Sequence, residues 1–249
     1  MPRIIAFAGK GGVGKTTVSG MLIRYLVERV HDGPVLAVDA DANSNLNEVL
    51  GIKVHTTIGE ARELLRKDVP AGMPKETWFE YKVHEAVIEA DGFDLLVMGR
   101  PEGAGCYCAA NTLAKKHIEA LKDNYAWVVV DNEAGMEHMS RLVTQDVDVL
   151  YVISDPSPRG LLTAKRIVEL VAELKLNVGR IAVIVNRVGH DEIPRLAGQN
   201  GLEVSGFIRN DELVTESDRE GVPVFRLSEE SAALTDAYAI FDTTLGRKE

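Results

Sequence analysis

The sequence predicts an α/β fold built on a doubly wound, mainly parallel sheet. Two observations support this prediction. Short apolar runs alternate with stretches of helical periodicity along the 249-residue chain, and such alternation is typical of βαβ units with right-handed crossovers. Several of the runs are also apolar at successive positions, as expected of strands that helices cover on both faces. Ligands of such sheets bind at the carboxyl ends of the strands.

Each apolar run is predicted to form one strand, and the seven runs are Ile4–Ala8, Val35–Val38, Leu95–Met98, Trp127–Val130, Val149–Ile153, Ile181–Val185 and Val204–Ile208. Apolar residues at helical spacing predict helices within 18–26, 161–174 and 234–245, and a further helix over Ala109–Leu121. The proline- and glycine-containing segment Lys67–Thr77 is predicted to be a surface connection. Because we find no internal repeat and no low-complexity tract, we expect residues 1–249 to form a single domain.

Composition narrows the class of protein. The hydrophobic share of 45% and the charged share of 27% are ordinary for a soluble globular protein and exclude disordered, collagen-like and coiled-coil classes. The net charge of −10 argues against nucleic-acid and anionic-membrane partners. No apolar run approaches the roughly 18–20 residues that span a bilayer, and the N-terminal stretch is too short for a signal peptide. We therefore expect a cytoplasmic protein.

A phosphate-binding loop is the first functional motif. Residues 9–16 read Gly-Lys-Gly-Gly-Val-Gly-Lys-Thr, between a predicted strand and a predicted helix. The glycines let backbone N–H groups turn toward phosphate oxygens, and the helix N-terminus adds partial positive charge. We expect Lys15 to bridge the β- and γ-phosphates and the Thr16 hydroxyl to bind Mg²⁺. The alternative is a glycine-rich turn without a ligand. The candidate nucleotide-binding residues of this loop are Gly9, Lys10, Gly11, Gly12, Val13, Gly14, Lys15, Thr16 and Thr17.

Polar residues at three other predicted strand ends extend this site. The second strand runs into Asp39 and Asp41, of which we expect one to face Mg²⁺ or its waters and the other the γ-phosphate. Asp131 closes the strand that begins at Trp127 and resembles a Walker B aspartate. Asn186 can offer an acceptor and a donor to an adenine edge, and Arg187 can stack on the base. For each of them, a residue that only caps a turn is the alternative.

Both cysteines of the chain lie within the segment Gly-Arg-Pro-Glu-Gly-Ala-Gly-Cys-Tyr-Cys at 99–108. Cys106 and Cys108 are too close to form an unstrained disulfide but suit a pair of thiolate metal ligands. Since a tetrahedral site needs four ligands, a two-fold dimer axis beside the segment would complete it. Tetrahedral thiolates suit Zn²⁺, a flattened set suits Ni²⁺, and Cu(I) is also soft enough. Two buried cysteines without a metal are the alternative.

Lys10, directly after the first glycine of the loop, resembles the signature lysine of the deviant Walker A ATPases, among them MinD, ParA and the nitrogenase iron protein. Together with the cysteine segment and with Asp-Asn-Glu-Ala-Gly-Met-Glu-His at 131–138, it makes the whole chain similar to the CooC family. These are nickel-insertion ATPases that mature carbon monoxide dehydrogenase. The related AcsF proteins serve acetyl-CoA synthase, and no residue separates the two clients on physical grounds.

The resemblance implies a MinD-like phosphate-loop ATPase that forms a homodimer, closes on ATP and reopens after hydrolysis to ADP. It implies that Lys10 reaches the partner's nucleotide and that Asp41 orients the attacking water at the start of a switch segment that continues through Asn43 and Asn45. The implied catalytic residues are Lys10, Lys15 and Asp41. Nickel, or zinc, is implied between the paired cysteines, with apo carbon monoxide dehydrogenase or acetyl-CoA synthase as the client.

The same resemblance assigns the remaining site residues. Asp39 and Asp131 would join Thr16 in holding Mg²⁺, partly through water, and Gly135 would present its N–H to the γ-phosphate. The implied base-side residues are Asn186, Arg187, Arg209 and Asp211. For His138, a relay of the nucleotide state and an exposed histidine both stay open.

Three other functions are weighed against this one. A MinD- or ParA-like positioning switch is disfavoured by the acidic charge and by the tail at 236–249, which has few basic residues. A redox protein like the nitrogenase iron protein would need two cysteines well separated in sequence. A simple phosphate-loop kinase would leave Lys10 and the cysteine pair without a role.

Overall fold

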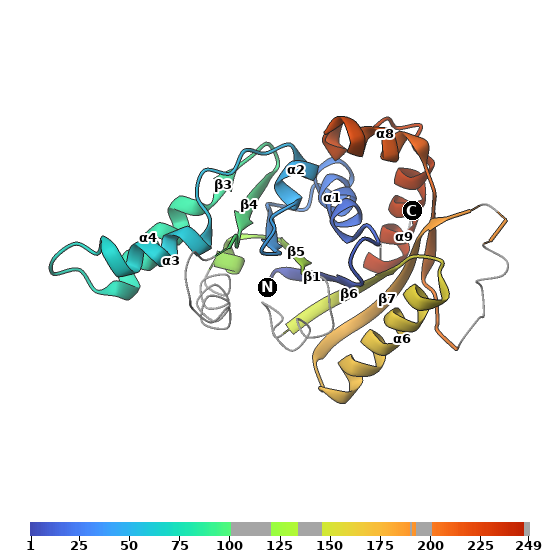
Figure 1. Cartoon of the computed structure of the whole chain (residues 1–249), viewed down its shortest axis with the longest axis horizontal. Coiled ribbons are helices and arrows are strands. Elements are labelled where there is room, and N and C mark those ends of the chain that lie inside the picture. Colours follow the sequence, from blue (N-terminus) through green and yellow to red (C-terminus); the bar gives the residue numbers. More distant parts are fainter. Residues whose placement is uncertain (101–120, 134–145, 190, 193–200, 247–249) are drawn as a thin grey trace.

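The computed structural model describes residues 1–100, 121–133, 146–189, 191–192 and 201–246. These residues form an eight-stranded sheet with the strand order β3-β4-β2-β5-β1-β6-β7-β8 (Figure 1). Neighbouring strands from β4 to β8 are parallel, and only β3 pairs antiparallel, with β4. The strands are β1 (Arg3–Gly9), β2 (Val35–Ala40), β3 (Ile88–Glu89), β4 (Phe93–Val97), β5 (Trp127–Asn132), β6 (Asp146–Ser154), β7 (Asn177–Val188) and β8 (Gly206–Arg209). The predicted doubly wound α/β fold is confirmed.

Helices cover both faces of the sheet. The α-helices are α1 (Lys15–Tyr25), α2 (Leu46–Leu50), α3 (Ile58–Lys67), α4 (Lys75–Ala86), α6 (Pro158–Glu173), α8 (Glu212–Glu220) and α9 (Ala232–Leu245). Shorter turns are the π-helical η1 (Leu26–Val30) and the 3₁₀ segments η2 (Lys122–Asn124) and η4 (Val224–Arg226). Among the described helices, none is long and apolar enough to cross a membrane.

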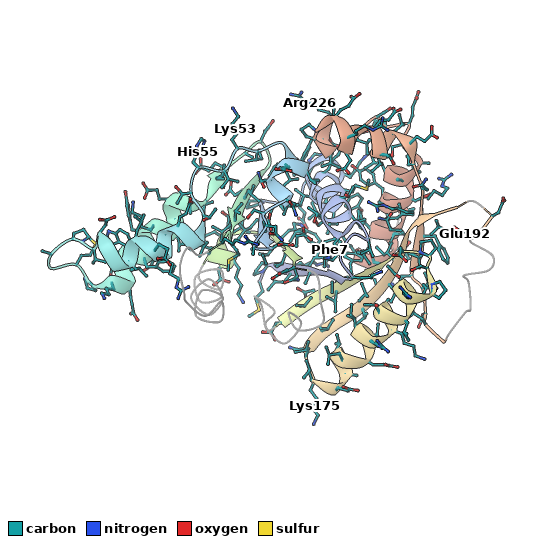
Figure 2. All side chains as sticks on the ribbon, in the orientation of Figure 1. Phe7, Lys53, His55, Lys175, Glu192 and Arg226 are labelled. Atoms are coloured by element: carbon teal, nitrogen blue, oxygen red, sulfur yellow. The ribbon has the colours of Figure 1, made fainter. Side chains whose placement is uncertain are left out.

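The central strand β1 shows why the sheet is apolar on both sides. Ile5 and Phe7 pack in one buried cluster with residues of α1 and α9, whereas Ala6 and Ala8 pack in another with residues of α6. A third cluster joins β2, β4 and β5 to α3 and α4. Because alternate residues of a strand point to opposite faces, a strand covered on both faces must be apolar at every position. Figure 2 shows Phe7 in the middle of the molecule.

Seven predicted strands correspond to β1, β2 and β4 to β8. The eighth strand, β3, was not predicted, because two residues carry no periodic signal. The helices expected within 18–26, 161–174 and 234–245 correspond to α1, α6 and α9. The helix expected over Ala109–Leu121 lies outside the described residues except for Leu121, which is buried.

The surface connection predicted over Lys67–Thr77 is wrong at both ends. Helix α3 runs through Lys67, and α4 begins at Lys75 directly after Pro74. A capping box starts α3, in which the Glu60 backbone N–H donates to the Thr57 hydroxyl and the Thr57 N–H donates to the Glu60 carboxylate (3.2 and 2.8 Å). Proline suits the start of a helix, so Pro74 opens α4 instead of extending the loop.

Candidate functional site

The phosphate loop joins the carboxyl end of β1 to the first residue of α1. Three of its glycines have positive φ, at +152° for Gly9, +80° for Gly12 and +88° for Gly14, which is the residue that precedes α1. A Cβ at Gly9 would come within 2.3 Å of the Ile153 carbonyl oxygen in β6. Glycine is therefore needed here both for its backbone conformation and for its size. The predicted strand, loop and helix are all present.

Lys15 lies where the loop passes into α1, and 8% of its surface is exposed. Its Nζ donates to the carbonyl oxygen of Lys10 at 3.3 Å. Burial lowers the pKa of Lys15, and the carboxylates of Asp131, Asp41 and Glu133 oppose that shift. A buried ammonium that faces several carboxylates and a loop of backbone N–H groups is suited to phosphate oxygens.

Two buried carboxylic acids lie side by side in the sheet, and one of them, Asp131, faces the charge of Lys15. Asp39 and Asp131 are paired in the register of β2 and β5, and they are 0% and 2% exposed. Burial raises the pKa of Asp39 to about 6 and that of Asp131 to about 7. A hydrogen bond from Thr16 and the charge of Lys15 act against the shift at Asp131.

The oxygen donors of this group fit Mg²⁺. The Oδ1 atom of Asp131 is buried and has no hydrogen-bond partner among the residues that the structure describes, and the Thr16 hydroxyl contacts the same carboxylate. Both oxygens of Asp39 already accept backbone N–H groups, from Asp41 at 3.0 Å and from Leu46 at 2.9 Å. Mg²⁺ commonly takes one or two carboxylates, nucleotide phosphates and several waters. Asp131 and Thr16 therefore suit direct contact, and Asp39 suits contact through water.

Asp41 follows the end of β2 and turns toward the loop. Its carboxylate accepts the backbone N–H of Asn43 at 2.8 Å, and Asp41, Asn43 and Asn45 line a cavity of about 530 Å³ together with Lys15. Asn43 also accepts a hydrogen bond from Arg100, between Oδ1 and Nη2 at 3.4 Å. The predicted water-orienting residue is thus on the phosphate side of the site.

A second cavity, of about 420 Å³, lies beside the first. The predicted base-side residues Asn186, Arg187, Arg209 and Asp211 all line it. The structure therefore brings together four residues that come from the ends of β7 and β8. Adenine contact by these residues stays a prediction.

Their side chains also have roles that the sequence did not reveal. Asn186 Nδ2 donates to the Val13 carbonyl oxygen at 2.9 Å, and Arg187 Nη1 donates to that of Gly12 at 3.0 Å, so both brace the phosphate loop. Arg209 forms two side-chain hydrogen bonds to Asp236, each 2.7 Å long. One further role could have been read from the sequence, because an aspartate directly before a helical pattern is a recognisable helix cap.

Asp211 is such a cap. Its Oδ1 accepts the backbone N–H of Leu213 at 2.9 Å at the start of α8. Its Oδ2 accepts from the Ser231 hydroxyl at 2.7 Å and from the Ala233 N–H at 3.0 Å. Both oxygens are therefore engaged. Burial acts to raise the pKa of Asp211, but these hydrogen bonds together outweigh it and hold the pKa below its usual value.

The remaining predicted residues divide into two groups. Lys10 is exposed at the rim of the loop, and its contact with a partner subunit stays a prediction. Cys106, Cys108, Gly135 and His138 lie outside the described residues. Within the described ranges, no group of three or more His, Cys, Asp or Glu side chains is arranged to hold a metal ion. A Mg²⁺ ion at Asp131 would thus depend on Thr16, water and nucleotide phosphates for its other ligands.

The parallel sheet, the glycine loop at the end of β1 and the acidic ends of β2 and β5 define a phosphate-loop nucleotide-binding protein. The chain belongs to the CobQ/CobB/MinD/ParA nucleotide-binding family, whose domain matches residues 4–224.

Similar proteins point in the same direction. An uncharacterized ATP-binding protein of Methanocaldococcus jannaschii is 42% identical over 98% of this chain and 99% of its own length. The carbon monoxide dehydrogenase accessory protein CooC of Rhodospirillum rubrum is 30% identical over 98% and 96% of the two chains. The structure of MinD from Pyrococcus horikoshii, complexed with Mg-ADP, matches with a TM-score of 0.72 and 22% identity over 98% and 96% of the chains. The last match shows the shared fold.

Proposed function

We propose that this chain is an ATP-hydrolysing metallochaperone that assists nickel insertion into carbon monoxide dehydrogenase or acetyl-CoA synthase. It would act as a homodimer that closes on ATP. The proposal is supported by the similarity to a CooC protein along almost the whole chain and by the pair Cys106 and Cys108. One structural observation carries it: the segment that precedes the cysteine pair in the sequence starts in contact with the nucleotide site.

Two contacts link the start of this segment to the nucleotide site. The Met98 N–H donates to the carbonyl oxygen of Asp39 at 2.9 Å, directly after β4. Two residues later, Arg100 contacts Asn43. The cysteines follow Arg100 by six and eight positions in the sequence. A movement of the segment after Asp39 would therefore act on the start of the cysteine segment.

Asp39 is the residue through which a nucleotide could move this segment. Its carboxylate holds the N–H groups of Asp41 and Leu46, and so fixes both ends of the segment between β2 and α2. A Mg²⁺-bound nucleotide beside Asp39 would change the charge that this carboxylate faces. The position of residues 41–46 would then depend on the nucleotide, and a metal that binds the two nucleotide states with different affinity would be released by hydrolysis.

The hydrolysis machinery is assigned to the residues at the phosphate loop. Lys15 and the loop N–H groups bind the phosphates, Asp41 orients the attacking water, and Lys10 reaches the nucleotide of the partner subunit. Thr16 and Asp131, with Asp39 through water, would hold Mg²⁺, which would supply charge neutralisation on the phosphates. Cys106 and Cys108 of two subunits together offer four thiolates to the transported metal.

The test is nickel-dependent activation of apo carbon monoxide dehydrogenase and, separately, of apo acetyl-CoA synthase, with ATP, with ADP and without nucleotide. The proposal expects ATP-dependent activation of one client. A variant with both Cys106→Ala and Cys108→Ala is expected to lose activation and to bind about half a metal ion less per chain, because one site is shared by two subunits. Its nucleotide affinity should remain at the parental value, which serves as the control for folding. Equal activation by parent and variant would disprove the cysteine role.

A MinD/ParA-like switch that positions a macromolecular partner is the second candidate, and the shared fold favours it. The structure weakens its membrane form, since the apolar face of α9 packs in the core through Leu234, Phe241 and Leu245. Sedimentation with anionic vesicles and retention on DNA, each with ATP and with ADP, test this candidate. Tight ATP-dependent binding to either would favour it over the metallochaperone.

A further inference from the structure

A cavity of about 270 Å³ lies at the end of the sheet where the parallel strands begin, opposite the phosphate loop. Strand β1 begins in this cavity at Arg3 and ends at Gly9 in the loop, and the parallel strands β5, β6 and β7 line the cavity with residues near their own starts. The last turn of α9 adds Thr244 and Leu245 to the lining. Among the described residues, none that lines this cavity also lines a cavity of the nucleotide site.

Two arginines line this cavity, Arg3 at the start of β1 and Arg180 near the start of β7. Arg3 Nη1 donates to the Leu245 carbonyl oxygen at 3.2 Å. Arg180 Nη1 donates to the carbonyl oxygens of Thr243 and Thr244 at 3.2 and 3.0 Å. Both guanidinium groups are therefore held at the carboxyl end of α9, where the helix dipole favours cations.

Both guanidinium groups keep donors beyond these contacts. Each group has five N–H donors, and on Arg3 and Arg180 only Nη1 donates to a residue that the structure describes. Within the same part of the chain, neither arginine forms an ion pair with a carboxylate, although the net charge of the protein is −10. Because two like charges at one helix end repel each other, an anion that contacts both would relieve the repulsion.

Two other polar side chains belong to the lining. Trp127 is 4% exposed, and its Nε1 is buried without a hydrogen-bond partner among the described residues. The Arg3 Cζ atom lies 5.2 Å from the centre of the Trp127 ring. A buried polar group without a partner is uncommon and indicates a place for water, an ion or a ligand. Asp148 has the opposite effect: its Oδ2 accepts the Ile4 N–H at 2.6 Å, and its negative charge would weaken the binding of an anion.

We propose that this cavity is an oxyanion-binding site, in which a carboxylate or phosphate group accepts hydrogen bonds from the remaining guanidinium donors of Arg3 and Arg180. The planar guanidinium fork matches the oxygens of both groups in a bidentate manner. The volume of about 270 Å³ suits a small anion, since pockets for drug-sized ligands usually measure roughly 300–1,000 Å³. The site goes beyond the proposed function and does not depend on it.

The experiment follows the fluorescence of Trp127 in the full chain with Trp78→Phe, which leaves Trp127 as its single tryptophan. Saturating ADP and Mg²⁺ occupy the phosphate loop, so that an added anion does not bind there. Inorganic phosphate and acetate are titrated separately at an ionic strength kept constant with chloride. We expect a saturable change with at least one of them, and the anion that acts at the lower concentration identifies the preferred oxyanion.

Substitutions of the charged lining residues are expected to change this affinity in opposite directions. Arg3→Gln and Arg180→Gln should each weaken binding at least roughly tenfold, because charge-assisted hydrogen bonds are lost. Asp148→Asn should strengthen binding, because it removes the repelling charge while the amide oxygen can still accept the Ile4 N–H. A residue with a purely structural role at this helix end would not produce such an increase.

Arg166→Gln in α6 is the matched control, since it removes one positive charge at an exposed position that does not line the cavity. It should keep the parental anion affinity. Arg3 and Arg180 are themselves exposed, so their variants should fold, and a parental ADP affinity verifies this. A parent that shows no saturable change, or arginine variants that bind the anion as tightly as the parent, would overturn the inference. The titration involves neither nickel nor a client enzyme, so either result would leave the metallochaperone proposal standing.

Discussion

Asp39 of β2 and Asp131 of β5 are direct neighbours in the sheet, so that two buried carboxylic acids meet beside the phosphate loop. Their pKa values are raised to about 6 and about 7, chiefly because burial disfavours the charged forms, and the charge of Asp39 adds to the shift at Asp131. Lys15 is the cation that opposes the shift at Asp131. Without nucleotide and Mg²⁺, this pair is a source of electrostatic destabilisation at neutral pH.

The first prediction concerns stability against pH. The folded-state pKa values lie above the unfolded value of about 3.9, so the folded protein binds more protons than the unfolded chain between about pH 4 and pH 7. The contribution of the pair to stability is therefore present at low pH and is lost as the pH rises through 6 and 7. Asp131→Asn should remove much of this loss and raise the melting temperature of the nucleotide-free protein at pH 8 by a few degrees.

Thermal melts at pH 5.5 and pH 8 in the absence of Mg²⁺ measure this difference. Asp91→Asn, at an exposed position far from the site in sequence, is the control and should keep the parental pH dependence. A parental slope in Asp131→Asn would contradict the prediction. Mg²⁺ with ADP should in turn stabilise the parent more at pH 8 than at pH 5.5, since Mg²⁺ binds the ionised carboxylates.

Some features of the site could be predicted because their signal is local. The phosphate loop can be recognised from its closely spaced glycines, one lysine and one threonine. Strands β1 and β5 can be recognised from unbroken apolar runs, which burial on both faces requires. Asp131 could be placed at the carboxyl end of its strand because the apolar run of β5 ends at the residue before it.

Other features depend on partners distant in sequence. Residue type shows that Asn186 can donate and accept, but not that its Nδ2 donates to Val13, 173 positions away. In the same way, nothing near Arg209 indicates its pairing with Asp236. The two-residue β3 was missed for a different reason, since it is too short to show a pattern.

The second prediction separates the two lysines of the loop. Lys15→Gln should weaken nucleotide binding by at least roughly tenfold, because it removes the buried charge at the phosphates. Lys10→Gln changes an exposed residue, and should leave monomer stability and nucleotide affinity near parental values. Its hydrolysis rate should nevertheless fall by a factor on the order of 10²–10³, the usual effect of removing one preorganised donor to the reacting group.

Mixed dimers give the control for this prediction. When Lys10→Gln chains are combined with Asp41→Asn chains, the site that holds the parental Asp41 also receives Lys10 from the other subunit. Part of the hydrolysis activity should therefore return, although each variant alone hydrolyses ATP much more slowly than the parent. A mixture that stays inactive would show that Lys10 acts within its own subunit or not at all.

The third prediction compares two glycines of similar backbone conformation. Gly12 and Gly14 have φ of +80° and +88°, but a Cβ at Gly12 would meet nothing within 4 Å, whereas one at Gly14 would lie 2.4 Å from Asn186 Nδ2. Each alanine substitution costs about 1–2 kcal/mol for the left-handed backbone. Gly14→Ala should cost roughly 1–3 kcal/mol more because of the overlap.

Denaturant titration of both variants measures these costs, and nucleotide titration shows whether the loop still binds phosphate. Combining Gly14→Ala with Asn186→Ala should recover part of the extra cost, since the overlapping atoms are removed; the double-mutant cycle isolates that coupling. Equal stabilities for Gly12→Ala and Gly14→Ala would mean that the Asn186 side chain yields without cost.

The fourth prediction concerns a buried arginine that supports the larger cavity. Arg24 of α1 is 4% exposed, and its Nη1 donates to the carbonyl oxygens of Val224 and Leu227 at 3.0 and 2.7 Å. It also pairs with Glu28 at 2.8 Å and with Glu229 at 2.5 Å. These contacts hold the segment around η4, which lines the cavity through Val224 and Leu227, against α1.

Arg24→Met should therefore destabilise the protein by about 1–3 kcal/mol, the range for leaving buried polar groups without a partner, because the carbonyl oxygens of Val224 and Leu227 lose their donor. Arg29→Met is the matched control, because Arg29 contacts the same Glu229 at 3.3 Å with 57% of its side chain exposed, and exposed pairs contribute about 0–1 kcal/mol. Denaturant titration distinguishes the two variants. If Arg24→Met and Arg29→Met proved equally stable, the segment around η4 would be held by its apolar contacts alone. The loss of the arginine would then leave the nucleotide affinity of the protein unchanged.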